Sequence, residues 1–231
     1  MITDYKHLPV GKYLDIIAIP RDTEQLDYQV RVVAILNDMS DDDVLDLPLP
    51  RYKEMAAAAD FLTAPVLKDG RNPFDGKNVP TSYTLGQQKL KLTVDPSKMT
   101  VAQYVDFQTF AKQDAPANLP LVLSCILVPE GKQYNEGYDV AEVHALIRDT
   151  FPVYDAFALS AFFLRKWLHL MRVTLTSSLY DLQRKKNKTP KEMELMAKTA
   201  SLIRSMKNGD GLPMWTQLAK QSASRGTTFG V

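Results

Sequence analysis

A stretch of about 30 residues without proline or glycine constrains the fold of this 231-residue chain more than any other feature. It follows Pro152 and continues to Lys186. Proline suits the first turn of a helix, and an uninterrupted helix of this length would be about 45 Å long. The first half of the stretch is apolar on nearly every side, whereas the second half is polar and basic. We therefore expect one long, aromatic-rich helix that begins in the core and then leaves it.

A second helix is predicted directly after the long one. Thr189 stands at the N-cap position of a capping box, with Pro190 at the first helical position and Glu192 at the third. Apolar side chains then recur at helical spacing: Met193, Met196, Ala197, Ala200 and Ile203. Two helices joined by a short turn favour a helical hairpin. Beyond it we expect one more short helix near Trp215 and a flexible tail over residues 222–231.

The rest of the chain has the pattern of shorter helices with one β-hairpin. Helical spacing, N-cap residues and prolines predict helices over residues 23–36, 41–47, 50–62, 100–111 and 139–147. Residues 119–128 are apolar and bracketed by prolines, which favours a short buried helix over a strand. Apolar and polar side chains alternate on both sides of a glycine turn near residues 82–94, which predicts a small β-hairpin. The expected fold is therefore mainly α.

We expect three parts in the chain: a main helical domain over residues 1–183, a basic helical extension over 184–221, and the tail. The charge is polarised along them. Residues 1–64 hold 6 basic and 12 acidic side chains, whereas residues 151–231 hold 13 and 5. Such ends can pair within one chain, stack copies head to tail, or attract an acidic partner. They can also be ordinary solvated faces.

Sequence motifs for catalysis, cofactors or metals are missing. Cys125 is the single cysteine, which excludes an internal disulfide and a multi-cysteine zinc site. The three histidines lie far apart, and no glycine-rich phosphate loop is present. We therefore predict no catalytic, cofactor or metal site and no enzyme activity. The competing hypothesis, an enzyme or nucleic-acid-processing factor that uses Asp106, Glu142 or His144, requires two or more of these residues to approach closely in one cleft.

Membranes and nucleic acids are disfavoured as partners. No apolar segment approaches the roughly 20 residues that a membrane-spanning helix needs, and no signal peptide is apparent, so we expect a cytoplasmic protein. The basic cluster at residues 184–188 lacks interleaved aromatic side chains that would stack on bases. Basic residues at the end of a helix also offset its partial negative charge.

The amount of apolar surface on the long helix instead indicates a protein-binding surface. It exceeds what one layer of neighbouring elements covers easily, and methionines supply adaptable packing. The basic cluster lies at the end of the same helix. The candidate partner-binding residues are Phe162, Phe163, Trp167, Met171, Arg184, Lys185 and Lys186.

Three segments of the chain carry a resemblance to a known group of proteins. Residues 98–108 (KMTVAQYVDFQ), 127–139 (LVPEGKQYNEGYD) and 160–164 (SAFFL) resemble small morphogenesis proteins of tailed bacteriophages, particularly those infecting Bacteroidetes, crAss-like phages included. The similarity covers the general layout of residues 5–180. The basic helical hairpin at the end of the long helix has no counterpart in that group.

The resemblance implies a non-enzymatic role in assembling phage particles. The leading hypothesis is a tail-assembly chaperone in the host cytoplasm, which binds phage structural proteins through the aromatic helix and the edge of the hairpin. The alternative is a permanent virion component, such as a connector ring or an internal protein, in which copies of the chain associate. A nucleic-acid-binding factor is the third and least favoured possibility.

Overall fold

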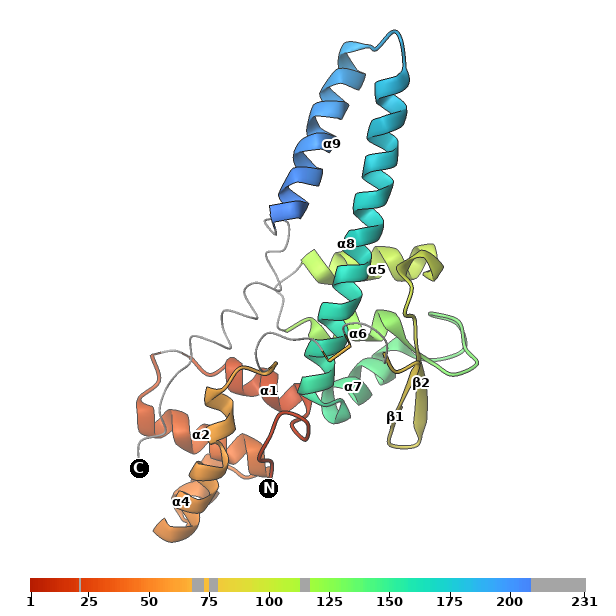
Figure 1. Cartoon of the computed structure of the whole chain (residues 1–231). Coiled ribbons are helices and arrows are strands. Elements are labelled where there is room, and N and C mark those ends of the chain that lie inside the picture. Colours follow the sequence, from red (N-terminus) through yellow and green to blue (C-terminus); the bar gives the residue numbers. More distant parts are fainter. Residues whose placement is uncertain (21, 68–72, 75–78, 113–116, 209–231) are drawn as a thin grey trace.

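Helices account for most of the chain that the computed structural model describes, which comprises residues 1–20, 22–67, 73–74, 79–112 and 117–208 (Figure 1). The α-helices are α1 (Val10–Ile17), α2 (Gln25–Asn37), α3 (Asp41–Leu45), α4 (Leu49–Ala58), α5 (Val101–Lys112), α6 (Leu119–Ile126), α7 (Val140–Thr150), α8 (Val153–Arg184) and α9 (Pro190–Asn208). The mainly-α prediction is confirmed. The helix expected near Trp215 and the tail expected over residues 222–231 lie outside the described residues.

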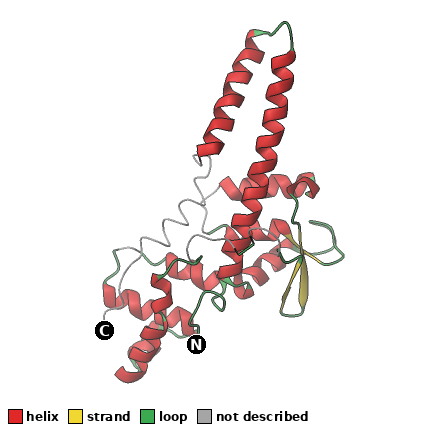
Figure 2. Cartoon of the chain, viewed as in Figure 1, coloured by secondary structure: helices red, strands yellow, loops and turns green. Residues whose placement is uncertain are grey.

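The predicted β-hairpin is present, and it belongs to a three-stranded antiparallel sheet (Figure 2). Strands β1 (Ser82–Leu85) and β2 (Gln88–Leu92) are joined by a two-residue turn. Gly86 in this turn has a φ of 57°, a conformation that glycine adopts without steric cost. The third strand, β3 (Leu127–Pro129), pairs with β2 on the side away from β1.

Strand β3 corrects the expectation that residues 119–128 form one buried helix. Helix α6 ends at Ile126, and the chain then continues in an extended conformation. Proline disfavours a helical backbone in the residue before it, which is Val128 here. The backbone N–H of Thr93 also donates to the carbonyl of Ile126 at 2.8 Å. Because helix and strand are both buried, the sequence shows one apolar run for two elements.

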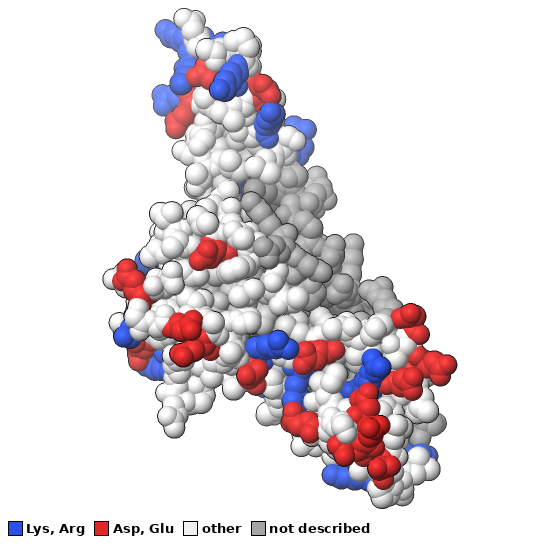
Figure 3. All heavy atoms as spheres, turned by 180° about the vertical axis from the view of Figure 1, so that it is seen from behind, with Lys and Arg blue, Asp and Glu red and all other residues white. Residues whose placement is uncertain are grey.

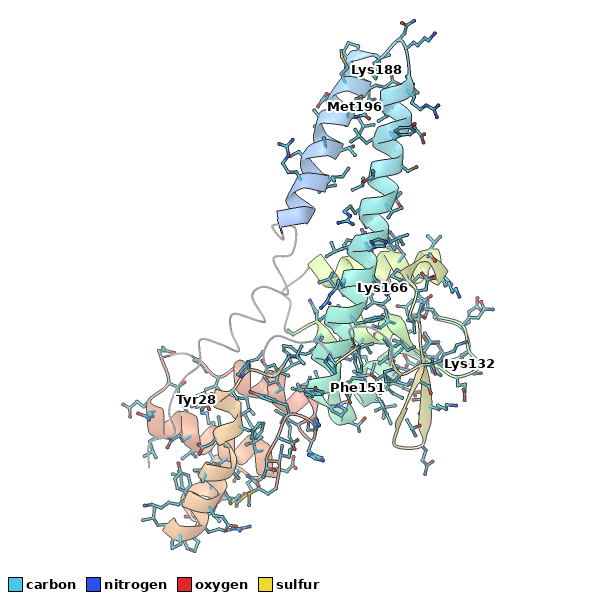
Figure 4. The ribbon with its side chains drawn as sticks, viewed as in Figure 1. Tyr28, Lys132, Phe151, Lys166, Lys188 and Met196 are labelled. Carbon is cyan, nitrogen blue, oxygen red and sulfur yellow. The ribbon has the colours of Figure 1, made fainter. Side chains whose placement is uncertain are left out.

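Helix α6 lies at the centre of the main core. Leu119, Leu123 and Ile126 have no exposed surface, and α5, α7 and α8 pack around them. Burial of each such side chain contributes about 1.5–3 kcal/mol. The N-terminal segment closes this core, since the N–H of Val10 donates to the carbonyl of Phe151 at 2.9 Å. Figure 4 shows Phe151 inside the body, where α8 begins.

Helices α2, α3 and α4 form a lobe with a small core of its own, built from Val30, Val33, Ala34, Val44, Met55 and Ala56. Ser40 and Asp43 form a capping box at the start of α3. Along α2 the apolar residues Val30, Val33 and Leu36 recur at helical spacing and are buried, whereas Leu26 is 59% exposed. Lys12 of α1 ties the lobe to the body through Asp38, at 2.7 Å.

The long helix predicted after Pro152 is present as α8, 32 residues in length. Pro152 is its N-cap residue rather than its first helical residue. Every residue that α8 buries lies at or before Leu164, and the helix then leaves the body (Figure 1). The expected domain boundary at residue 184 falls at the far end of this projection. We refer to the projecting part, residues 165–208, as the arm; it comprises the outer part of α8, the turn after it and α9.

Candidate protein-binding arm

The arm is an antiparallel pair of helices that stands away from the body (Figure 1). Helix α8 runs outward and ends at Arg184, and α9 returns from Pro190 toward the body. The predicted helical hairpin is therefore observed. The first part of α8, up to Leu164, is anchored in the core, so the core fixes the direction of the arm.

The turn at the tip of the arm is held by the predicted capping box. The backbone N–H of Glu192 donates to the Thr189 hydroxyl at 3.2 Å, and the N–H of Thr189 donates to the Glu192 carboxylate at 2.9 Å. Lys185 donates to the same carboxylate at 2.7 Å. The hydrogen bond from Lys185, and then those from Thr189, lower the pKa of Glu192 to about 2. The tip is thus a defined structure in which Glu192 stays ionised below its ordinary pKa of 4.5.

The seam between the two arm helices is only partly shielded from solvent. Half-buried apolar residues recur at spacings of three and four along α8, and others mark the facing side of α9: Leu168, Met171, Leu175, Leu179, Leu182, Met196, Ala200 and Ile203. Among the described residues after Leu164, Thr199 alone is buried. The seam of α9 also differs from the expected one, since Met193 and Ala197 are exposed.

Large apolar side chains lie on the outer surface of the arm. Their exposed fractions range from 44% to 56%, and they comprise Val173, Tyr180, Met193, Leu195 and Leu202. An isolated pair of helices gains stability mainly by burying apolar surface, and these five side chains stay largely exposed. Sequence reasoning missed most of these residues, because a helical stripe does not reveal which face lacks a neighbour.

The aromatic residues predicted to bind a partner lie at the base of the arm. Trp167 is half-buried and packs on Phe107 of α5, with ring centroids 6.2 Å apart. The Tyr104 hydroxyl lies 3.7 Å from the sulfur of Met171. Phe162 is half-buried, with the Lys166 ammonium 5.7 Å from its ring centroid.

Phe163 differs from the other candidates because it is a core residue. Its side chain is 1% exposed, and its ring meets Phe107 edge-on at 5.0 Å. It therefore supports the base of the arm from inside. The exposed surface of the arm does not include it.

The three basic candidates lie at the tip. Arg184, Lys185 and Lys186 are all exposed, and Figure 4 shows the neighbouring Lys188 near the tip of the arm. Arg184 stacks over Tyr180 at 5.2 Å, and Lys188 donates to the Lys185 carbonyl at 2.8 Å. The structure thus separates the predicted site into an aromatic base and a basic tip at opposite ends of the arm.

A buried polar cluster beneath the base joins α5, α6 and the loop after β3. The Tyr134 hydroxyl donates to Asp106 at 3.0 Å and lies 3.7 Å from the Cys125 sulfur. Gln103 donates to the Cys125 carbonyl at 3.0 Å. Burial raises the pKa of Cys125 to about 12. These contacts link three elements, and burial keeps the thiol protonated near neutral pH.

The residues of the enzyme hypothesis do not meet in the structure. Asp106 bonds Tyr134, whereas Glu142 is exposed and His144 is half-buried on α7. Burial and the nearby Arg148 lower the pKa of His144. None of Asp106, Glu142 and His144 forms a hydrogen bond or an ion pair with another of the three.

The described residues contain no group of three or more histidine, cysteine, aspartate or glutamate side chains placed to hold a metal ion. Within the same residues, no helix combines the length and the apolar character that crossing a membrane requires.

Comparisons of the chain with protein-family models, with curated proteins and with solved structures give no match. The resemblance to phage morphogenesis proteins therefore has its support in the three sequence segments alone.

Proposed function

We propose that this protein is a non-enzymatic assembly protein of a tailed bacteriophage, of the tail-assembly-chaperone type, that binds other phage structural proteins in the host cytoplasm. The arm carries the proposal. Its first helix begins in the core, its described residues expose five large apolar side chains, and it ends in a basic tip. An apolar centre with a polar or charged rim is typical of protein-binding sites.

The edge of the sheet is the second surface of the proposal. Strand β1 pairs with β2 on one side, and its other side is the edge of the described sheet. Edge strands offer unpaired backbone groups to an added strand from another chain. The arm and this edge belong to one body, so a single partner or two neighbouring ones can use both.

Two matched double variants test the proposal. Val173→Ser with Leu195→Ser removes exposed apolar surface from the arm. Val101→Ser with Val105→Ser removes the same kind of surface from α5, where these valines are 82% and 52% exposed. The chain is co-expressed with the products of the genes that flank its own, and complexes are measured by size-exclusion chromatography with light scattering.

We expect a complex of the wild-type chain with one flanking product, weakened at least about tenfold by the arm variant. The α5 variant should bind as the wild type does. Absence of any complex would contradict the proposal, as would equal loss in both variants.

A permanent virion component is the second candidate, and the opposite charges of the two chain ends favour it. Such a protein would be retained in mature particles in repeated copies. Mass spectrometry of purified particles separates the candidates, because a transient chaperone is absent from them and a structural component is abundant.

A further inference from the structure

The two ends of the molecule carry opposite charge. Between residues 165 and 204 the arm holds ten basic and three acidic residues. Residues 25–58, which span α2 to α4 and are called here the acidic lobe, hold seven acidic and three basic residues. Figure 3 shows acidic side chains gathered over the lobe end and basic ones around the tip of the arm.

Both ends also expose apolar side chains beside their charges. On the acidic lobe Leu26, Leu45 and Leu49 are 59–64% exposed, and on the arm five large apolar residues are 44–56% exposed. Stable protein interfaces combine an apolar centre with a polar rim. Complementary charge selects the partner and the register. The arm and the acidic lobe therefore match each other in charge and in exposed apolar surface.

The two surfaces cannot meet within one chain. The arm and the acidic lobe lie at opposite ends of the molecule, with the body between them (Figure 1). The core that anchors α8 fixes this separation. Two arms pairing with each other would bring like charges together, which is unfavourable. The acidic lobe of a second copy offers the arm both opposite charge and exposed apolar side chains.

We propose that the arm of one copy docks on the acidic lobe of a second copy, head to tail. The inference rests on the proposed function, since it names a second copy as a partner of the arm. A head-to-tail contact leaves one arm and one lobe free in each dimer. Repetition of the contact therefore builds a closed ring if the rotation closes, or a filament if it does not.

Four residues allow a charge-reversal test that breaks no side-chain hydrogen bond or ion pair between described residues. Lys186 and Lys191 at the tip, and Asp42 and Asp46 on the lobe, form no hydrogen bond or ion pair through their side chains with other described residues. The Lys185–Glu192 pair and the Ser40–Asp43 capping box remain in place when they are changed. The tip variant is Lys186→Glu with Lys191→Glu, and the lobe variant is Asp42→Lys with Asp46→Lys.

Sedimentation velocity of the full chain measures association at about 0.05 M and about 0.5 M salt, which differ strongly in electrostatic screening. We expect the wild type to self-associate at low salt, with dissociation at high salt. The tip variant and the lobe variant should each weaken self-association at least about tenfold. The chain with all four reversals should associate again, because its opposite charges are restored with exchanged sign.

A control pair separates local from general charge effects. Lys91→Glu with Lys132→Glu changes the net charge as much as the tip variant does, but on exposed body positions. This variant should associate as the wild type does. Circular dichroism checks that each variant is folded.

Three results would overturn the inference. The wild type could stay monomeric at low salt, the tip variant and the lobe variant could each associate as strongly as the wild type, or the fourfold variant could stay monomeric. The same variants are tested for binding the flanking gene products. If the wild type is monomeric and the tip variant loses that complex, the arm binds a different protein rather than a second copy of this chain. The inference would then fail while the proposed function stands. Self-association of the wild type without any complex with a flanking gene product would support the inference and contradict the proposed function.

Discussion

Gly11 allows helix α1 to approach α7. A Cβ atom at this position would lie 2.9 Å from both the Cγ and the carbonyl oxygen of Arg148. The backbone oxygen cannot move without displacing α7, and overpacking of this kind costs about 1–3 kcal/mol. Alanine at a helical position gains up to about 1 kcal/mol over glycine. We therefore predict that Gly11→Ala lowers the free energy of unfolding by about 1 kcal/mol in a urea titration. Increased stability would contradict the close approach.

Cys125 illustrates how burial controls reactivity. Because the thiolate is the reactive form and burial raises the pKa of this thiol to about 12, we predict very slow modification by a thiol reagent at pH 8. The rate should rise to that of a free cysteine when urea unfolds the chain. Fast modification of the folded protein would show that α6 opens readily and would contradict the buried polar cluster.

The capping box at the tip controls the first turn of α9. We predict that Thr189→Ala destabilises this turn by about 1 kcal/mol, which corresponds to roughly fivefold faster hydrogen exchange of its amides. The amides of α6 should be unaffected, since that helix is in the core. Unchanged exchange in α9 would show that the tip is held by other contacts.

Glu192 makes the tip sensitive to acid. Its pKa is lower in the folded arm, about 2, than its ordinary value of 4.5. Its stabilising effect is therefore complete above pH 4.5 and is lost as the pH falls toward 2. Hydrogen exchange at the start of α9 should accelerate over this interval. In Glu192→Gln, which keeps the capping geometry without the titrating group, the acceleration attributable to this residue should disappear.

Elements with strong local signals were predicted from the sequence, and those that depend on distant contacts were not. The long helix, the capping box at Thr189 and the turn at Gly86 each have a local physical cause, and each is confirmed. Helix α1 was missed, since its eight residues include a glycine whose position only α7 explains. Strand β3 was missed because its pairing with β2 links segments about 40 residues apart.

The candidate site was predicted in its residues better than in its geometry. The basic tip and Trp167 stand out in the sequence by composition and pattern. An apolar helix does not show which of its aromatic residues reach the core, so Phe163 could not be distinguished from Phe162. The exposed apolar surface of the arm depends on the absence of a third helix beside it among the described residues, which no local pattern encodes.

At the scale of the whole molecule, the arm and the core differ in how much apolar surface they bury. Helix α6 is buried almost completely, whereas the described part of the arm buries Thr199 alone. Local opening free energies follow such differences. We therefore predict that amides of the arm exchange far faster than those of α6 in dilute protein at high salt, measured by hydrogen exchange with mass spectrometry.

The same measurement at low salt and high protein concentration connects the arm to its partner surface. If a second copy covers the arm, exchange should slow both in the arm and over residues 25–58, and α6 should not change. The tip variant Lys186→Glu with Lys191→Glu should remove the slowing at both places together, because one contact protects both. Slowing of the arm without the lobe would place a different surface opposite the arm. Protection at high salt in dilute protein would show instead that the arm is stable by itself, and its apolar surface would no longer require a partner.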